Sequence, residues 1–155
     1  MDLVAIPGLN ASAVHTMASE IGPELRKWPT AKAFYSWLGL APHHEVSGGK
    51  TWRRSTRQSR NRAGHAFRPA AQAVSRSQNS LGAFYRRTRA RLGPKPAIVA
   101  TAHKIARIAY HLLTHRTPYR DLSAAGYERR TRDRDLAALR KKAARFGCTL
   151  VESPA

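Results

Sequence analysis

Apolar residues recur every three to four positions along most of the chain, which is the spacing of one face of an α-helix. In the clearest case, Ile98, Ile105 and Leu112 fall on one predicted face of the segment 97–115. Asn10 and Thr30 are well placed to cap helices with their side chains. The pattern predicts six helices, at about residues 11–21, 31–38, 61–77, 81–92, 97–115 and 132–146, with a break or kink in the third at Pro69.

Residues 40–60 depart from this pattern, because Pro42, Gly48 and Gly49 stand there among many polar residues. Strand signals are weak throughout, since no segment alternates several β-branched and aromatic residues with polar ones. The expected fold class is therefore all-α: a compact helical domain with a helix-hairpin-helix-like start, a long basic loop and a C-terminal helical extension. We expect the domain to cover residues 1–120 and the charged extension to cover residues 121–155.

The charge identifies the class of partner. The 155 residues include 28 Lys and Arg against 9 Asp and Glu, a formal net charge of +19. Because such self-repulsion opposes compaction, we expect a polyanion to neutralise it, and nucleic acid is the favoured one. An anionic membrane surface or an acidic protein is the alternative, but bulky apolar residues are few in the most basic stretch. No apolar run approaches the roughly 20 residues of a membrane span.

Several kinds of site are disfavoured by the residues present. Cys148 is the only cysteine, which excludes an intramolecular disulfide and fits a reducing compartment. No basic segment followed by an apolar stretch opens the chain, so we expect a cytoplasmic protein, nucleoid-associated when bound to DNA. Seven histidines are scattered without a strong metal-ligand spacing, and carboxylates are scarce. On its residues alone, the chain carries no metal site and no complete metal-dependent nuclease.

The segment Ile6-Pro7-Gly8-Leu9-Asn10 is typical of the turn in a helix-hairpin-helix element. Such a turn presents backbone N–H groups at a helix N-terminus to a phosphate. Gly8 adopts positive φ freely, whereas Asn10 stands where the usual hairpin has a second glycine. An ordinary turn before a core helix explains the segment equally well.

A basic segment follows Lys50 and interleaves arginines with hydroxyl side chains. Guanidinium groups and hydroxyls bind phosphates, and Trp52 can stack on a base. The alternative is a solvated charged face, which the scarcity of acidic neighbours disfavours. The nucleic-acid-binding residues expected here are Lys50, Trp52, Arg53, Arg54, Arg57, Arg60 and Arg62, together with Gly8, Asn10, Gly48 and Gly49.

Ser47 lies beside two flexible glycines and close to several cations, which could favour its alkoxide as a nucleophile. His43 and His44 are near enough in sequence to be considered as proton acceptors. On its residues alone, Ser47-Gly48-Gly49 is more often a flexible loop than a catalytic turn.

An ordered set of short motifs resembles one protein family. The set includes Ala83-Phe84-Tyr85-Arg86-Arg87, Ala102-His103-Lys104-Ile105-Ala106-Arg107 and Pro118-Tyr119. Ahead of these stand Ile6-Pro7-Gly8, Glu20-Ile21-Gly22, Thr30-Ala31-Lys32, Gly39-Leu40-Ala41-Pro42 and Ser47-Gly48-Gly49. In order and spacing they resemble the C-terminal domain of insertion-sequence one-ten (Piv/MooV-type, bridge-RNA-guided) transposases, over residues 4 to about 120.

This resemblance implies a DNA-binding part of a transposase, with Ser47 as the nucleophile that attacks a DNA phosphate. In the family, a separate DEDD domain supplies carboxylates for Mg²⁺, and a guide RNA can select the DNA. We expect that DEDD domain to be absent from this chain, a truncated or split gene product whose activity requires a DEDD-domain partner or a full-length transposase, in a homo-oligomeric complex. The alternatives are a non-catalytic nucleic-acid-binding module and, less favoured, a structural RNA-binding protein.

Overall fold

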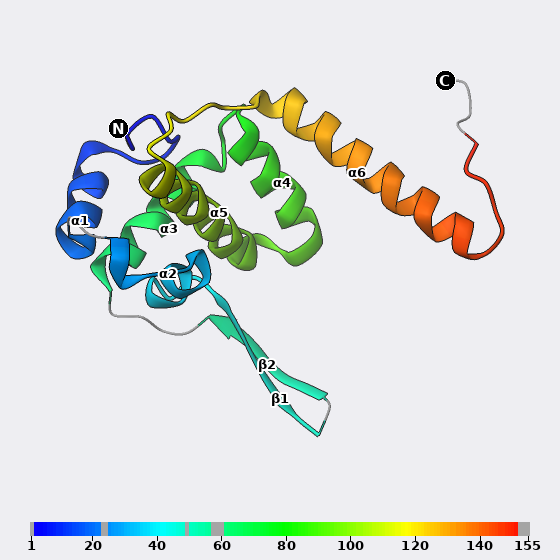
Figure 1. Ribbon diagram of the computed structural model, residues 1–155, viewed down its shortest axis with the longest axis horizontal. Helices are drawn as coiled ribbons and strands as arrows, with labels where there is room; N and C mark the ends of the chain where they lie inside the picture. Colours follow the sequence, from blue (N-terminus) through cyan, green and yellow to red (C-terminus); the bar gives the residue numbers. More distant parts are fainter. Residues whose placement is uncertain (1, 23–24, 49, 57–60, 152–155) are drawn as a thin grey trace.

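Helices account for the body of the molecule, as the sequence predicts (Figure 1). The computed structural model describes residues 2–22, 25–48, 50–56 and 61–151. The all-α class is confirmed. In chain order the elements are α1 (Ala11–Ile21), the 3₁₀ turn η1 (Leu25–Lys27), α2 (Ala31–Trp37), β1 (Pro42–Ser47), β2 (Lys50–Thr56), α3 (Arg62–Val74), α4 (Ser80–Leu92), α5 (Pro94–His115) and α6 (Ser123–Arg145).

The helix starts follow from local capping. The Asn10 side chain accepts a hydrogen bond from the Ala13 N–H at 2.8 Å, and Thr30 Oγ1 accepts one from the Ala33 N–H at 3.2 Å. Asn61 and Asn79 cap α3 and α4 in the same way. Each cap satisfies an N–H that the first turn leaves without a partner, so both predicted capping residues are confirmed.

Two predicted helix starts were wrong, α3 ends at Val74 and not at residue 77, and the break considered at Pro69 does not occur. Pro69 lies inside α3 without ending it, because burial of Phe67, Ala70 and Ala71 around it holds the helix. α5 begins at Pro94, where proline suits a first helical turn. α6 begins nine residues before the predicted start at residue 132, at Ser123.

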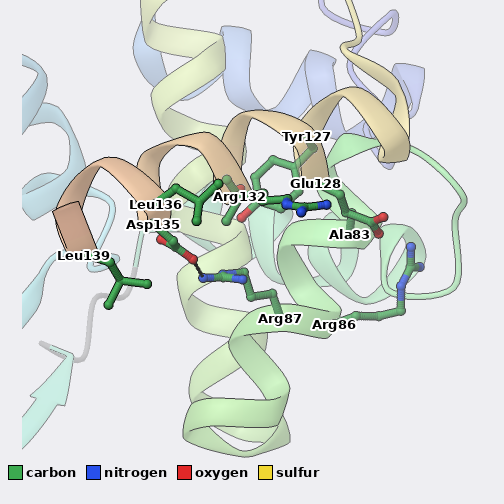
Figure 2. A pocket seen from close by; sticks show the side chains of 10 residues that line it. Ala83, Arg86, Arg87, Tyr127, Glu128, Arg132, Asp135, Leu136 and Leu139 are labelled. Carbon is green, nitrogen blue, oxygen red and sulfur yellow. Dashed lines mark hydrogen bonds and ion pairs between the residues drawn. The ribbon is translucent and has the colours of Figure 1, made fainter. Parts of the chain in front are cut away.

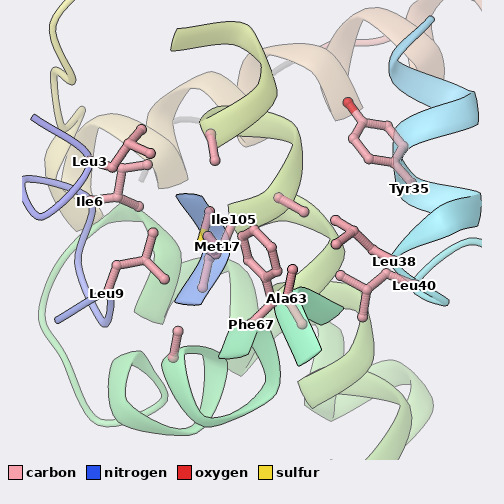
Figure 3. Packing of buried hydrophobic residues seen from close by; sticks show 14 of the residues in the cluster. Leu3, Ile6, Leu9, Met17, Tyr35, Leu38, Leu40, Ala63, Phe67 and Ile105 are labelled. Atoms are coloured by element: carbon pink, nitrogen blue, oxygen red, sulfur yellow. The ribbon is translucent and has the colours of Figure 1, made fainter. Parts of the chain in front are cut away.

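The core lies where α1, α2, α3 and α5 pack together. Met17, Phe67 and Ile105 come from three different helices and are fully buried in its centre (Figure 3). Phe34 of α2 packs against Trp28 and Tyr110, with ring centroids 5.5 and 5.3 Å away. The N-terminal turns cover one side of this core through Leu3, Ile6 and Leu9, so the segment before α1 is an integral part of the fold.

The expected long basic loop is instead a two-stranded antiparallel hairpin for most of its length. β1 and β2 pair from Pro42–Thr56 at the base to Ser47–Lys50 at the turn, with a bulge after Glu45. The hairpin projects from the end of α2 away from the helices (Figure 1). Because the hairpin projects away from the helices, its strands need no alternating apolar face toward their core, which is why the sequence pattern did not indicate strands.

Candidate nucleic-acid interface

The hairpin places Ser47 at the turn farthest from the helical body. Ser47 is the last residue of β1 and pairs with Lys50, the first residue of β2. Gly48, which follows Ser47, has a φ of 56°. Glycine adopts this left-handed region without steric cost, so Gly48 favours the tight reversal after Ser47.

The histidines that precede Ser47 are not placed beside it. His43 and His44 lie toward the base of β1, where they pair with Ser55 and Arg54. At about 3.3 Å per strand residue, they are displaced from Ser47 by roughly 10–13 Å along the strand. Lys50, and neither histidine, is the residue opposite Ser47 in the register.

The basic residues of the hairpin follow one another along β2. Arg53 pairs with Glu45, and the bulge leaves Trp52 as the extra residue between the Val46–Thr51 and Glu45–Arg53 pairs. Bulges strengthen strand twist and redirect a residue relative to its neighbours. Gly49, Arg57 and Arg60, also predicted to bind nucleic acid, lie outside the described residues.

Arg62 lies apart from the turn of the hairpin, in the first turn of α3. Its side chain is 80% exposed, and its Nε is 3.8 Å from Glu20 Oε1 of α1. An ion pair this exposed contributes little to stability. The same exposure leaves the Arg62 guanidinium accessible to solvent.

Gly8 and Asn10 both serve the fold. Gly8 has a φ of 89°, and a Cβ there would lie 2.4 Å from the Ala70 carbonyl oxygen of α3. The Asn10 side chain is engaged in capping α1. These contacts explain why both residues stand in a close-packed turn before a core helix. The phosphate-binding role of this turn stays a prediction.

A second cationic surface lies between α4 and α6, where the sequence analysis placed no site. A groove of about 460 Å³ separates the two helices (Figure 2). Arg86, Arg87 and Arg132 line it beside Glu128 and Asp135, and an ion pair of 2.5 Å joins Arg87 to Asp135.

Lys104 of α5 anchors the start of α6 from the inner side. Its Nζ lies 4.2 Å from the ring centroid of Phe84 on α4 and 4.7 Å from that of Tyr127 on α6. Burial, and then the nearby charges of Arg107 and Arg134, lower the pKa of Lys104. Three cations from α5 and α6 therefore lie close enough to repel one another.

Neighbouring His103 contacts Tyr35 of α2, with ring centroids 4.5 Å apart. Burial and the charge of Arg107 lower the pKa of His103, so the imidazole is neutral at pH 7. In the sequence, His103, Lys104 and Arg107 stood out only as part of a family motif. Arg107 follows Lys104 by three residues and His103 by four, and these helical spacings are the signal that could have grouped them.

Two absences hold for the part of the chain that the structure describes. There, no three His, Cys, Asp or Glu side chains are grouped so that they could hold a metal ion. None of the helices described has the length and apolar character required to cross a bilayer.

Comparison with known proteins gives one finding. Residues 2–86 match the family model described as Transposase IS116/IS110/IS902 family. The matched part runs from the N-terminal turns through the hairpin and α3 into α4, and leaves α5 and α6 outside. Searches of curated proteins and of solved structures found no significant match.

Proposed function

Because the chain belongs to the IS116/IS110/IS902 transposase family, we propose that it is the serine-bearing, DNA-binding part of a transposase acting in DNA transposition. The observation that carries this proposal is the position of Ser47. It stands opposite Lys50 at the turn of a hairpin that projects from the helical body. A residue held there can reach a DNA phosphate without the helices colliding with the duplex.

In this proposal, the cations that follow the hairpin turn bind the DNA. Lys50, Arg53, Arg54, Arg57, Arg60 and Arg62 contact phosphates in this proposal, and Trp52 stacks on a base. Gly48 and Gly49 allow the backbone to approach the strand. If about six cations bind B-DNA phosphates, the logarithm of affinity falls with the logarithm of salt concentration at a slope near −5.

The chemical step is a transesterification. Ser47 Oγ attacks a phosphodiester phosphorus, a new ester bond joins serine to DNA, and one P–O bond to a sugar breaks. The serine proton passes to a base, and the leaving sugar oxygen takes up a proton. One phosphodiester replaces another, so no external source of energy is needed.

In this proposal, the general base and the metal ion are supplied by another segment or another chain. The described residues hold no group of three metal-ligating side chains, which does not fit a resident Mg²⁺ site. A DEDD carboxylate set on another segment or chain supplies the metal site, so the partners are DNA, that DEDD domain or a full-length transposase, a guide RNA and further copies of the chain. Cytoplasmic location with nucleoid association follows from DNA as the partner.

The decisive experiment traps the covalent intermediate. The chain, supplied with a DEDD domain of the family and labelled donor DNA, is denatured in detergent, and labelled DNA that migrates with protein is measured. The wild type and Ser55→Ala should form this adduct, and Ser47→Ala should not. Ser55 is the matched control, because it is a serine of the same hairpin near its base, paired with His43.

The same variants separate the alternatives. If Ser47→Ala binds DNA normally and recombination with the DEDD domain continues, the chain is a non-catalytic nucleic-acid-binding module. If the wild type binds A-form RNA more tightly than duplex DNA at matched salt, a structural RNA-binding protein is favoured instead.

A further inference from the structure

α6 lies beyond the residues that match the family, and its second half extends away from the body (Figure 1). Its first half is held against α4 and α5. Tyr127 contacts Phe84 with ring centroids 6.3 Å apart and lies against Lys104, and Thr131 is buried. The helix is thus fixed at one end, and 23 residues at about 1.5 Å each give it a length near 35 Å.

Four cations form a stripe along this helix. Arg130, Arg134, Lys141 and Arg145 are all exposed. At about 100° per residue they fall within a sector of roughly 60°, and the first and last are about 22 Å apart. We call these four residues the α6 stripe.

Acidic residues are turned away from the stripe. Glu128, Asp133 and Asp135 lie roughly 90° or more from its centre by the same helical geometry. The Arg134 Nε does lie 3.9 Å from Asp135 Oδ1, but that carboxylate makes its shorter contact, of 2.5 Å, with Arg87. The sector of α6 that carries the stripe therefore contains four cations and no acidic residue, although Arg134 lies near the Asp135 carboxylate at its side.

Lys104 and Arg107 of α5 extend the positive charge beside the stripe. Both interact electrostatically with neighbouring cations, and the charge of Arg134 reaches Lys104. Placing two exposed arginines near the partly buried Lys104 costs free energy in the isolated chain, and a bound polyanion relieves that cost.

We propose that the α6 stripe, with Lys104 and Arg107 beside it, binds the phosphate backbone of a double-helical nucleic acid. This inference rests on the proposed function, and it adds a second contact surface outside residues 2–86. Cations distributed over about 22 Å can follow a backbone that carries one phosphate per roughly 3.4 Å of each strand.

The neighbours of the stripe favour this partner over others. Ala137 and Ala138 are exposed and lie between Arg134 and Lys141, and their small side chains allow a backbone to approach closely. Membrane binding by a basic helix requires bulky apolar residues along one face, whereas Leu136 and Leu139 line the groove toward α4. A second copy would bring the same positive charges together.

The test compares two double variants with equal charge. Arg130→Gln/Lys141→Gln removes two cations of the stripe. Arg129→Gln/Lys142→Gln removes one arginine and one lysine at adjacent, exposed positions that are turned about 100° away. Fluorescence anisotropy measures the affinity of each for a labelled 30-base-pair DNA duplex and a matched RNA duplex between 0.05 and 0.3 M salt.

For the DNA duplex, the slope of the logarithm of affinity against the logarithm of salt concentration should be about 1.8 less steep in the stripe variant than in the wild type. Each phosphate contact contributes about 0.9 to this slope. If the two removed contacts contribute nothing to the affinity near 1 M salt, the association constant of the stripe variant at 0.15 M salt is about 30-fold below that of the wild type. The control variant should keep the wild-type slope. If the affinity falls for only one of the two duplexes, that result identifies whether DNA or RNA binds α6.

The inference is overturned if the stripe variant keeps the wild-type slope, or if the control variant loses as much, which would indicate a general effect of net charge. Circular dichroism checks that α6 stays helical in both. Failure of the proposed function is a different result: the wild type would then bind neither duplex. Wild-type binding that depends on the hairpin cations and not on the stripe overturns only this inference.

Discussion

Replacing Gly8 with alanine tests how the N-terminal turn is built. Gly8 has a φ of 89°, and an alanine Cβ would lie 2.4 Å from the Ala70 carbonyl oxygen and 2.8 Å from Val74 Cγ1. Ordinary contacts of this kind begin near 3.4 Å. The Ala70 contact is to backbone of α3, which a side-chain rotation cannot relieve, so the turn must move away from the helix.

Two costs add in this variant. An L-residue in the left-handed region costs about 1–2 kcal/mol, and forcing an extra methyl group into a packed contact costs about 1–3 kcal/mol. We expect a loss of about 2–5 kcal/mol, a large part of the 5–15 kcal/mol that typically stabilises a domain.

Gly22→Ala is the matched control. Gly22 also has a positive φ, of 72°, but a Cβ there would meet no other atom within 4 Å. It therefore carries the backbone cost without the contact with α3. The difference between the variants isolates that contact, and at 2–4 °C per kcal/mol in a chain of this size it should be roughly 4–8 °C in Tm for about 2 kcal/mol.

Thermal unfolding by circular dichroism measures both variants, and DNA binding is measured well below their Tm values. Equal Tm losses in the two variants would refute the packing argument. If Gly8→Ala instead keeps its stability and loses affinity for DNA, the turn contacts phosphate, as the helix-hairpin-helix hypothesis holds.

Three further predictions concern the attachment of α6. Asp121 accepts hydrogen bonds from Ser80, Tyr119 and the Ser123 N–H; burial alone would raise its pKa, but these bonds outweigh burial and lower it. Because the folded-state pKa is depressed, this carboxylate stabilises the fold above about pH 4, and the stabilisation is lost as pH falls through the folded pKa. Asp121→Asn should cost about 1 kcal/mol at pH 7 in urea unfolding, and a cost that stays constant down to pH 2 would contradict this. Lys104→Met keeps the chain length but removes the charge between Phe84 and Tyr127, so it should cost about 1 kcal/mol and speed amide hydrogen exchange around residue 127; unchanged exchange would show that the cation does not hold α6. A double-mutant cycle on Arg87 and Asp135, whose side chains are 53% and 46% exposed, should give a coupling of about 0.2–1 kcal/mol that fades in 1 M salt, and a salt-independent coupling would argue against an exposed ion pair.

Local signals in the sequence were sufficient for the helical class and for several helix ends. Asn10 and Thr30 cap their helices through contacts with residues three positions away. Ile105 and Leu112 are buried on α5 as their spacing indicates. These features depend on interactions within one or two turns, which is the range over which a sequence pattern can be interpreted directly.

The candidate site was predictable only in part. Ser47 and the basic residues after it were found from composition, from flanking glycines and from a family resemblance. That Ser47 pairs with Lys50, whereas His43 and His44 pair nearer the base of the hairpin, follows from the register. Because the hairpin projects from the helical body, its strands need no apolar alternation in the sequence, so this geometry required the structure.

What the sequence determined by itself was an α-helical, strongly basic chain with capped helices and a serine–glycine turn among cations. Tertiary structure alone decided the start of α6, the tolerance of Pro69 and the close packing of Gly8 on α3. It also brought Lys104, Arg107 and Arg134 together on two helices about 30 residues apart in the chain. The reason is physical: each of these outcomes depends on burial or charge contributed by a distant segment, which local spacing does not encode.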